Sequence, residues 1–309
     1  VQLWLNLRYA CHLLDILYFS EILLKKKKKL RTYLRLSLPP TMLPALTHLD
    51  LSNNGISTFS FVKLKNLLSL TLDNNAIRRL EGYMGVDLTG LQNLEKLSIA
   101  HNNIEYINSR AIEQLPNLRY LNLSSNSLST FNFDMLIPLR SLEVLVIDSN
   151  SLDTLSLTSS LNITELSLDR NNLRYLSINT FFYLYKLTKL SLSENKIQNI
   201  QVDTFQNQEL LEVLYLNDNE LSHLPVGWCK SMKMLRYLNL AGNKFTLLES
   251  AIYSSDLPIK QLHFEDNPLM YINGSVFQMI PENMTIYLYV RNTLKNIPED
   301  RPTISQIDL

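Results

Sequence analysis

Apolar and polar residues follow one pattern that recurs about every 24 residues along most of this 309-residue chain. Each copy has the form LxxLxLxxNxL, as in LTHLDLSNNGI from Leu46 and LTKLSLSENKI from Leu187. The second and third apolar positions of a copy lie two residues apart, which is the period of a strand with one buried face. The pattern therefore predicts one short strand per copy, with the intervening side chains exposed on the other face.

An asparagine stands at the same place in each of ten copies, and successive asparagines are 21, 24 or 27 residues apart. An asparagine that follows a strand can hydrogen-bond backbone groups that the turn leaves unpaired. Because a single repeat cannot bury its own apolar face, the copies must stack. We therefore expect a buried ladder of side-chain amides bonded to backbone, made by Asn54, Asn75, Asn102, Asn126, Asn150, Asn171, Asn195, Asn219, Asn243 and Asn267.

The ten copies between Leu46 and Leu269, with a degenerate eleventh near 286–297, resemble the leucine-rich repeat superfamily. A phenylalanine ten residues after the asparagine, at Phe181, Phe205 and Phe277, is similar to the typical 24-residue subclass of animal extracellular proteins, which includes Toll-like and chaoptin-like molecules. Cys229 occupies the equivalent place in one copy. The resemblance implies an α/β solenoid, a right-handed horseshoe with a parallel concave β-sheet and about ten to eleven repeats.

The ends of the chain differ from the repeats. Residues 1–45 carry eight basic and two acidic side chains, and five of the bases form the run Lys25–Lys29. This run follows the apolar stretch Val1–Leu24, whereas a secretory signal has its charge first. We predict a basic leader or degenerate N-terminal region at 1–44, of which residues 1–35 pack poorly, and a solenoid at 45–309 whose last repeat is degenerate.

Composition excludes several classes of protein. The 46% of apolar residues is enough to build a core, so the chain is not disordered. A net charge of zero argues against a generally basic nucleic-acid binder, so no nucleic acid is expected as a partner. The five histidines are scattered, and no metalloprotease, serine hydrolase or phosphate-loop motif is present. We therefore predict no enzyme activity, no cofactor and no metal.

Two features bear on the compartment. Cys11 and Cys229 are too few for the cysteine-rich caps that extracellular relatives usually carry. Glycosylation sequons begin at Asn162, Asn273 and Asn283, and a fourth, at Asn122, would place a glycan on a strand. Sequons are no more frequent than the Asn, Ser and Thr content gives by chance. An extracellular or cell-surface location is predicted from the resemblance, and a cytoplasmic one stays open.

The concave face carries the candidate binding site. Its outward positions lie six, four and two residues before each register asparagine, and they hold six acids against two bases. Exposed aromatic and β-branched clusters framed by polar residues are typical of protein-binding surfaces, although such residues also suit strands. The candidate ligand-binding residues are Tyr120, Val144, Val146, Asp148, Asp169, Val213, Tyr215, Tyr237, His263 and Glu265.

These features together predict a non-catalytic module that binds a protein ligand, with basic character, on its concave face. The resemblance implies the ectodomain, or part of one, of a receptor or adhesion protein. The alternative is an intracellular leucine-rich repeat scaffold or regulatory adaptor. A homodimer and membrane attachment through segments outside this chain also stay open.

Overall fold

The computed structural model describes residues 2–3, 46–60, 64–81, 85–252, 258–270, 272, 274–281, 283–289 and 307–308. Apart from Gln2–Leu3, the predicted leader at 1–44 lies outside the described residues, and so do Cys11 and the sequon at Asn273. The chain forms two compact units. The first contains residues 1–128 and 135–142, and the second contains residues 129–134 and 143–309.

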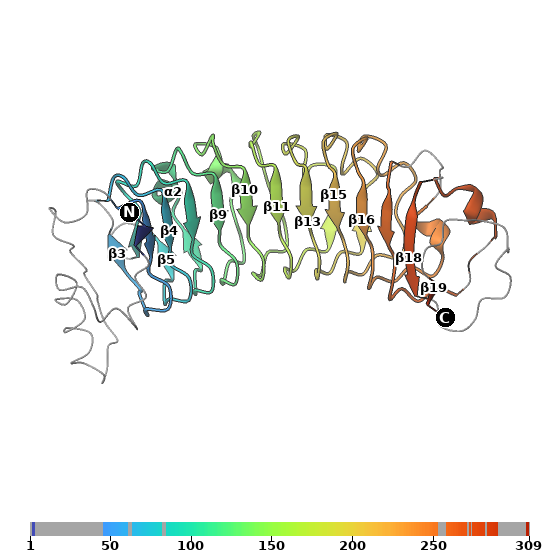
Figure 1. Ribbon diagram of the computed structural model, residues 1–309, viewed down its shortest axis with the longest axis horizontal. Coiled ribbons are helices and arrows are strands. Elements are labelled where there is room, and N and C mark those ends of the chain that lie inside the picture. The colour runs from blue at the N-terminus through green and yellow to red at the C-terminus, as the bar shows by residue number, and fades with distance from the viewer. Residues whose placement is uncertain are drawn as a thin grey trace. The chain divides into compact units, whose positions relative to one another are not determined.

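Each unit is built on parallel strands, one from each repeat, and a two-residue strand outside the repeats is added at either end, β1 in the first unit and β19 in the second (Figure 1). In the first unit the neighbouring strands are β1 (Gln2–Leu3), β2 (His48–Asp50), β4 (Ser69–Thr71), β7 (Lys96–Ser98) and β9 (Tyr120–Asn122). In the second they are β10 (Val144–Val146), β11 (Glu165–Ser167), β13 (Lys189–Ser191), β15 (Val213–Tyr215), β16 (Tyr237–Asn239), β17 (Gln261–His263), β18 (Thr285–Tyr289) and β19 (Ile307–Asp308).

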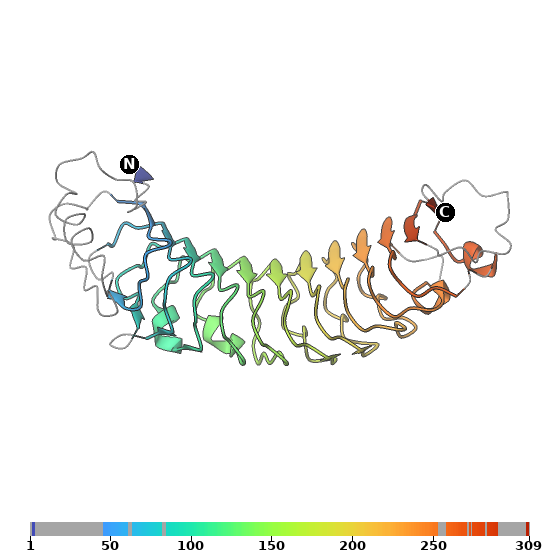
Figure 2. The ribbon, with the colours of Figure 1, turned by 90° about the horizontal axis from the view of Figure 1, so that it is seen from below.

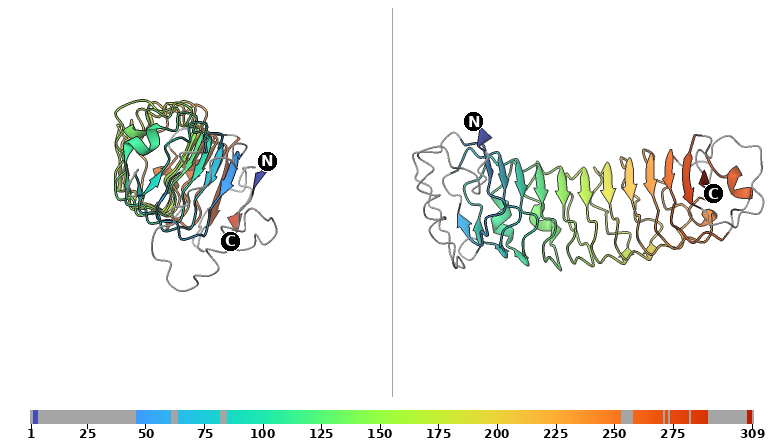
Figure 3. Two further views of the ribbon diagram at one scale, coloured as in Figure 1. Left: turned by 90° about the vertical axis from the view of Figure 1, so that its left-hand side faces the viewer. Right: turned by 60° about the horizontal axis from the view of Figure 1, so that its bottom comes forward.

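Residues at equivalent positions of successive repeats pair with each other across the sheet. Val144 pairs with Glu165, which pairs in turn with Lys189, and the same position pairs at each later repeat through Thr285. The middle residue of each strand from β10 to β17, and Ile286 at the equivalent position of β18, is an aliphatic side chain that is buried, whereas most of its neighbours along the strand are exposed or half-buried. The right-hand view of Figure 3 shows the resulting row of strands. The parallel-strand solenoid predicted from the period is thus confirmed.

The segments between these strands contain little helix. Among the described residues only α2 (Ser109–Glu113) is α-helical, and η1 (Phe133–Leu136), η2 (Leu248–Ser250) and η3 (Gly274–Gln278) are short 3-10 turns. Three two-stranded ladders lie outside the main sheet: β3 (Phe59–Ser60) with β6 (Val86–Asp87), β5 (Arg79–Leu80) with β8 (Tyr106–Ile107), and β12 (Tyr175–Leu176) with β14 (Asn199–Ile200). Figure 2 shows α2 and the return segments on the side of the strands away from the sheet's open face.

The register asparagines hydrogen-bond backbone groups of their own repeat and of the repeat before it. The amide nitrogen of Asn195 donates to the carbonyls of Leu192 and Ser193 at 3.1 and 3.2 Å and to that of Leu168 at 2.9 Å. Its oxygen accepts from the N–H of Leu173 at 3.1 Å. The side chain is 7% exposed. One amide therefore links two repeats where the chain leaves the strand.

The residue before each register asparagine has a left-handed backbone, which the repeat pattern did not predict. In the ten repeats its φ lies between 52° and 64°, and only Gly242 among the ten is a glycine. This conformation turns the chain so that the following amide points into the repeat. The other nine are Asn53, Asn74, His101, Ser125, Ser149, Arg170, Glu194, Asp218 and Asp266, none of them β-branched.

Aromatic rings fill the core behind the second unit's strands. Phe181 and Phe205 stack at 5.6 Å between ring centroids, with an angle of 8° between their planes. The ring that meets Phe205 on its other side is Trp228, at 6.0 Å. Cys229, which holds the phenylalanine position in the sequence, is a buried free thiol beside it. The series of aromatic contacts thus continues through Trp228, which directly precedes the position that phenylalanine holds in other repeats.

Candidate binding surface

The open face of the second unit's main sheet is made by the side chains six, four and two residues before each register asparagine, and we call it the sheet face. Its members on β10 to β18 include Val146, Asp169 and Tyr215, which are half-buried because neighbouring strands crowd them. A hollow of about 560 Å³ lies on this face over β10, β11, β13, β15 and β16. It contains Val144, Val146, Asp169 and Tyr215 from the predicted set.

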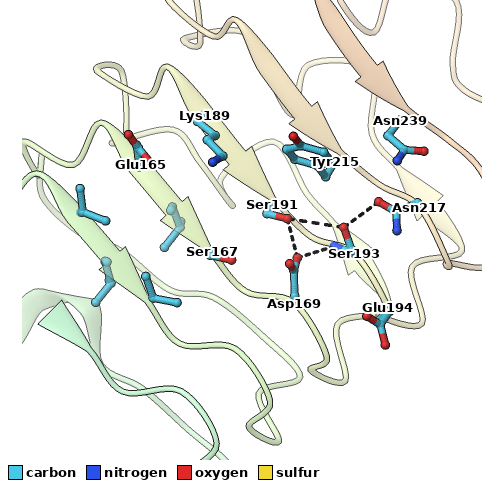
Figure 4. Close-up of a pocket in the computed structure, with 14 residues that line it drawn as sticks. Glu165, Ser167, Asp169, Lys189, Ser191, Ser193, Glu194, Tyr215, Asn217 and Asn239 are labelled. Carbon is cyan, nitrogen blue, oxygen red and sulfur yellow. Dashed lines mark hydrogen bonds between the residues drawn. The ribbon is translucent and has the colours of Figure 1, made fainter. Parts of the chain in front are cut away.

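Asp169 organises the floor of this hollow (Figure 4). One oxygen of its carboxylate accepts from the Ser191 hydroxyl at 2.6 Å and from the Ser193 N–H at 2.7 Å. The Ser193 hydroxyl in turn donates to the side-chain oxygen of Asn217 at 2.8 Å. The first carboxylate oxygen of Asp169 is therefore occupied within the protein, where it holds neighbouring repeats together.

Asp148 has a similar structural role one repeat earlier. Its carboxylate accepts from the backbone N–H of Asp169 at 2.9 Å. Burial raises the pKa of Asp148, and the nearby Asp169 charge raises it further, while hydrogen bonds from Ser167 and the Asp169 backbone act in the opposite direction. Asp148 and Asp169, both predicted from the sequence to contact a ligand, thus bridge neighbouring repeats.

A continuous row of aromatic rings crosses four adjacent strands of the sheet face. The centroids of Tyr215 on β15 and Tyr237 on β16 are 5.1 Å apart, and Tyr237 and His263 on β17 are separated by the same distance. His263 stacks on Tyr287 of β18 at 4.3 Å, with an interplanar angle of 9°. We call these four residues the aromatic row. All four are half-buried, so each ring supports its neighbours and keeps some surface open.

A single carboxylate lies beside the aromatic row. One oxygen of Glu265 is 3.1 Å from Nδ1 of His263. The other, Oε2, is buried and makes no hydrogen bond within the described part of the chain. Burial raises the pKa of Tyr237, and the neighbouring Tyr215 and Glu265 raise it further. The negative charge of Glu265 therefore acts on Tyr237, the second of the four rings.

The structure distributes the predicted residues between the two units. Tyr120 lies on β9 of the first unit, where the Lys96 ammonium sits 5.0 Å from its ring centroid. Val213, Tyr215, Tyr237 and His263 lie on consecutive strands of the second unit, and Glu265 follows the last of these strands by two residues. Sequence reasoning missed Tyr287 because its repeat has Arg291 at the register position. Continuing the 24-residue count to Arg291 would have placed Tyr287 on the same face.

The remaining predictions concern modification, metals and the membrane. Asn283 is exposed and Asn162 half-buried, while Asn122 on β9 accepts hydrogen bonds from the Ser124 N–H and hydroxyl. Among the described residues no three His, Cys, Asp or Glu side chains are grouped to hold a metal ion. Within the same ranges no helix has the length and apolar character needed to cross a bilayer. The sequons remain predictions.

Family models match most of the solenoid. A leucine-rich repeat model matches residues 92–152, 161–207 and 185–245, and a model of two leucine-rich repeat copies matches residues 44–83. The chain belongs to the leucine-rich repeat superfamily. The stacked strands and register asparagines described above are thus those of a leucine-rich repeat solenoid. No curated protein sequence matches this leucine-rich repeat chain significantly.

Solved structures share the leucine-rich repeat fold at low sequence identity. TLR13 in its complex with ssRNA13 has a TM-score of 0.65 and 21% identity, over 78% of this chain and 41% of the TLR13 chain. The Drosophila Toll–Spatzle complex gives a TM-score of 0.60 and 20% identity, over 76% of this chain and 36% of its counterpart. This leucine-rich repeat chain thus spans less than half of either matched protein. Because one of these was solved with RNA, the prediction that nucleic acid is not a partner is unsupported.

Proposed function

We propose that this chain is a non-catalytic recognition module that binds a protein ligand on its sheet face, as part of the ectodomain of a receptor or adhesion protein. The observation that carries the proposal is the aromatic row, which presents four ring systems on one rigid surface. Tyrosine is enriched at protein-binding hot spots because it buries a large area at little entropic cost. Parallel strands hold the rings in place before any ligand arrives, which lowers the cost of binding.

The fold similarity to Toll-like structures supports the same proposal. One of those proteins was solved with ssRNA and the other with Spatzle, so this type of solenoid is used for ligand recognition in those proteins. Residues of a binding surface need side chains that a ligand can still reach. The rings of the aromatic row meet that requirement, because each retains exposed area.

Affinity capture with the full chain tests the proposal. Wild-type protein and the double variant Tyr215→Ala/Tyr237→Ala are immobilised in parallel, and the captured proteins are quantified by mass spectrometry. Each substitution should cost about 1 kcal/mol or more at a hot spot, so a true ligand should fall by about tenfold or more on the double variant.

The matched control removes two exposed tyrosines outside the sheet face, in Tyr175→Ala/Tyr185→Ala. Tyr175 and Tyr185 are 51% and 44% exposed. The control should capture the ligand as well as the wild type does. A ligand that is lost from the control and retained by the sheet-face variant would place the binding site elsewhere and overturn the proposal.

The intracellular scaffold is the second candidate, and the buried free thiol of Cys229 is the observation that favours it. A reducing compartment keeps such thiols free. Treatment of the protein from its native cells with an endoglycosidase separates the two candidates. A mobility shift that disappears in Asn283→Gln supports the extracellular proposal, because Asn283 is exposed. Protein with no glycan at any sequon favours the scaffold.

A further inference from the structure

The aromatic row lacks any strong cation. On and just after the four strands β15 to β18, the described sheet-face positions are occupied by Val213, Tyr215, Asn217, Tyr237, Asn239, Ala241, Gln261, His263, Glu265, Thr285 and Tyr287. None is lysine or arginine, and Glu265 is the only acid among them. Beside the face positions, the exposed Asp218 and Asp266 lie at the end of the strands where Glu265 lies, whereas Arg236 and Lys260 lie at the opposite end, next to Tyr237 and Gln261. The end of the aromatic row beside Glu265 therefore favours a positive group over a phosphate.

Glu265 is placed to accept hydrogen bonds from such a group. Its side chain is 32% exposed. Because Oε2 is buried, Oε1 is the oxygen that a ligand can reach, and it keeps a lone pair beyond the contact with Nδ1 of His263 at 3.1 Å. Glu265 also raises the pKa of Tyr237, as expected for a carboxylate close to that ring.

We propose that the aromatic row binds the guanidinium group of an arginine side chain on the protein ligand, stacked over Tyr215 and Tyr237 and donating to Glu265. The inference rests on the proposed function and specifies the chemistry of the ligand. A guanidinium is planar and weakly hydrated, so it can stack on an aromatic face while its N–H groups reach a carboxylate. An ammonium is a more strongly hydrated point charge and meets both requirements less well.

Defined peptides test the chemistry independently of the natural ligand. The probes are an acetylated and amidated Ser-Arg-Ser-Arg-Ser peptide and the same peptide with citrulline, the neutral analogue of arginine, in place of both arginines. Binding to the full chain is measured by NMR titration at neutral pH and moderate salt. The arginine peptide should bind about tenfold more tightly, since a desolvated cation–π contact together with a charged hydrogen bond is lost with citrulline.

Variants of the row assign the binding to these residues. Glu265→Gln, which keeps the shape of the side chain, should remove most of the preference for arginine over citrulline. Tyr237→Ala should weaken the arginine peptide about fivefold or more, whereas Tyr237→Phe keeps the ring and should stay within about twofold of wild type. Tyr175→Ala and Glu209→Gln change exposed residues outside the sheet face and should have no effect.

Equal affinity for the two peptides, or no binding of the arginine peptide, would overturn the guanidinium proposal. A single-stranded oligonucleotide that binds the wild type and is lost in Tyr237→Ala would overturn it in favour of a nucleic-acid ligand. These results are separable from the capture experiment. If Tyr215→Ala/Tyr237→Ala still loses a captured protein while the peptides show no arginine preference, the sheet face is the binding surface and only its assigned chemistry is wrong.

Discussion

Replacing one register asparagine should destabilise the second unit by an amount that its hydrogen bonds predict. In Asn195→Ala the amide that links two repeats is removed. The three carbonyls it serves each keep a second donor: Leu168 retains Asn171, Leu192 retains Asn219, and Ser193 retains the backbone N–H of Arg170. The N–H of Leu173 has Asn195 as its partner in the described structure and would be left without one.

The expected loss follows from this difference. An unpaired buried N–H costs about 1–3 kcal/mol, whereas carbonyls that keep one donor cost much less. We therefore expect Asn195→Ala to lower the free energy of unfolding by about 2–3 kcal/mol. Asn195→Asp should cost more at neutral pH, because a carboxylate would face three carbonyl oxygens in a buried site. That additional cost should shrink in acid, where the introduced carboxyl group is protonated and can donate.

Urea unfolding followed by circular dichroism measures the loss, and hydrogen exchange of the Leu173 amide locates it. Exchange at Leu173 should accelerate in Asn195→Ala more than at amides two repeats away. The control is Asn199→Ala, since Asn199 is exposed and its removal should change stability by less than about 0.5 kcal/mol. A loss below about 0.5 kcal/mol in Asn195→Ala, or an unchanged Leu173 amide, would refute the ladder argument.

Three further outcomes test other parts of the structure. Ser149 has a φ of 53°, so Ser149→Val should lower stability by about 1–2 kcal/mol while Ser149→Gly should not, as thermal melting would show. Burial raises the folded pKa of Asp148, so the folded state binds that proton more tightly and loses stability as pH rises through that pKa. Asp148→Asn should therefore raise the urea midpoint at neutral pH and give no gain below the unfolded pKa of about 3.9; an equal gain in acid would contradict this. Burial raises the pKa of the Cys229 thiol to about 11, so in a Cys11→Ser background iodoacetamide should label it only after unfolding, as mass spectrometry would detect.

The sequence by itself determined where the strands lie and which of their side chains are buried. In LTKLSLSENKI the period-two pattern is local, so Leu190 and Leu192 had to share the buried face whichever repeats lie beside them. The spacing of the register asparagines likewise set which residues pair across the sheet. Because the repeats stack in phase, Lys189 and Val213 are neighbours although 24 residues separate them.

Only the tertiary structure showed what the polar side chains between those positions do. Asp169 looked like an exposed acid, but its carboxylate is engaged by Ser191 and Ser193 of the next repeat. The left-handed residue before each asparagine had a partial signal in the sequence, because Asn, Asp, His or Gly holds six of the ten positions, whereas Ser125, Ser149, Arg170 and Glu194 carry none. The hydrogen bonds of Asp169 are made to an adjacent repeat, which a pattern within one repeat does not contain.

The aromatic row illustrates the division most clearly. The repeat predicted that Tyr215 and Tyr237 lie on adjacent strands, and in the structure these strands pair and the two rings are in contact. The stacking of His263 on Tyr287 and the burial of one Glu265 oxygen, which leaves the other for a ligand, depend on how each side chain is rotated and packed against the next strand. Repeat periodicity sets the spacing of backbones, whereas side-chain packing decides which of the atoms between them are left for a ligand.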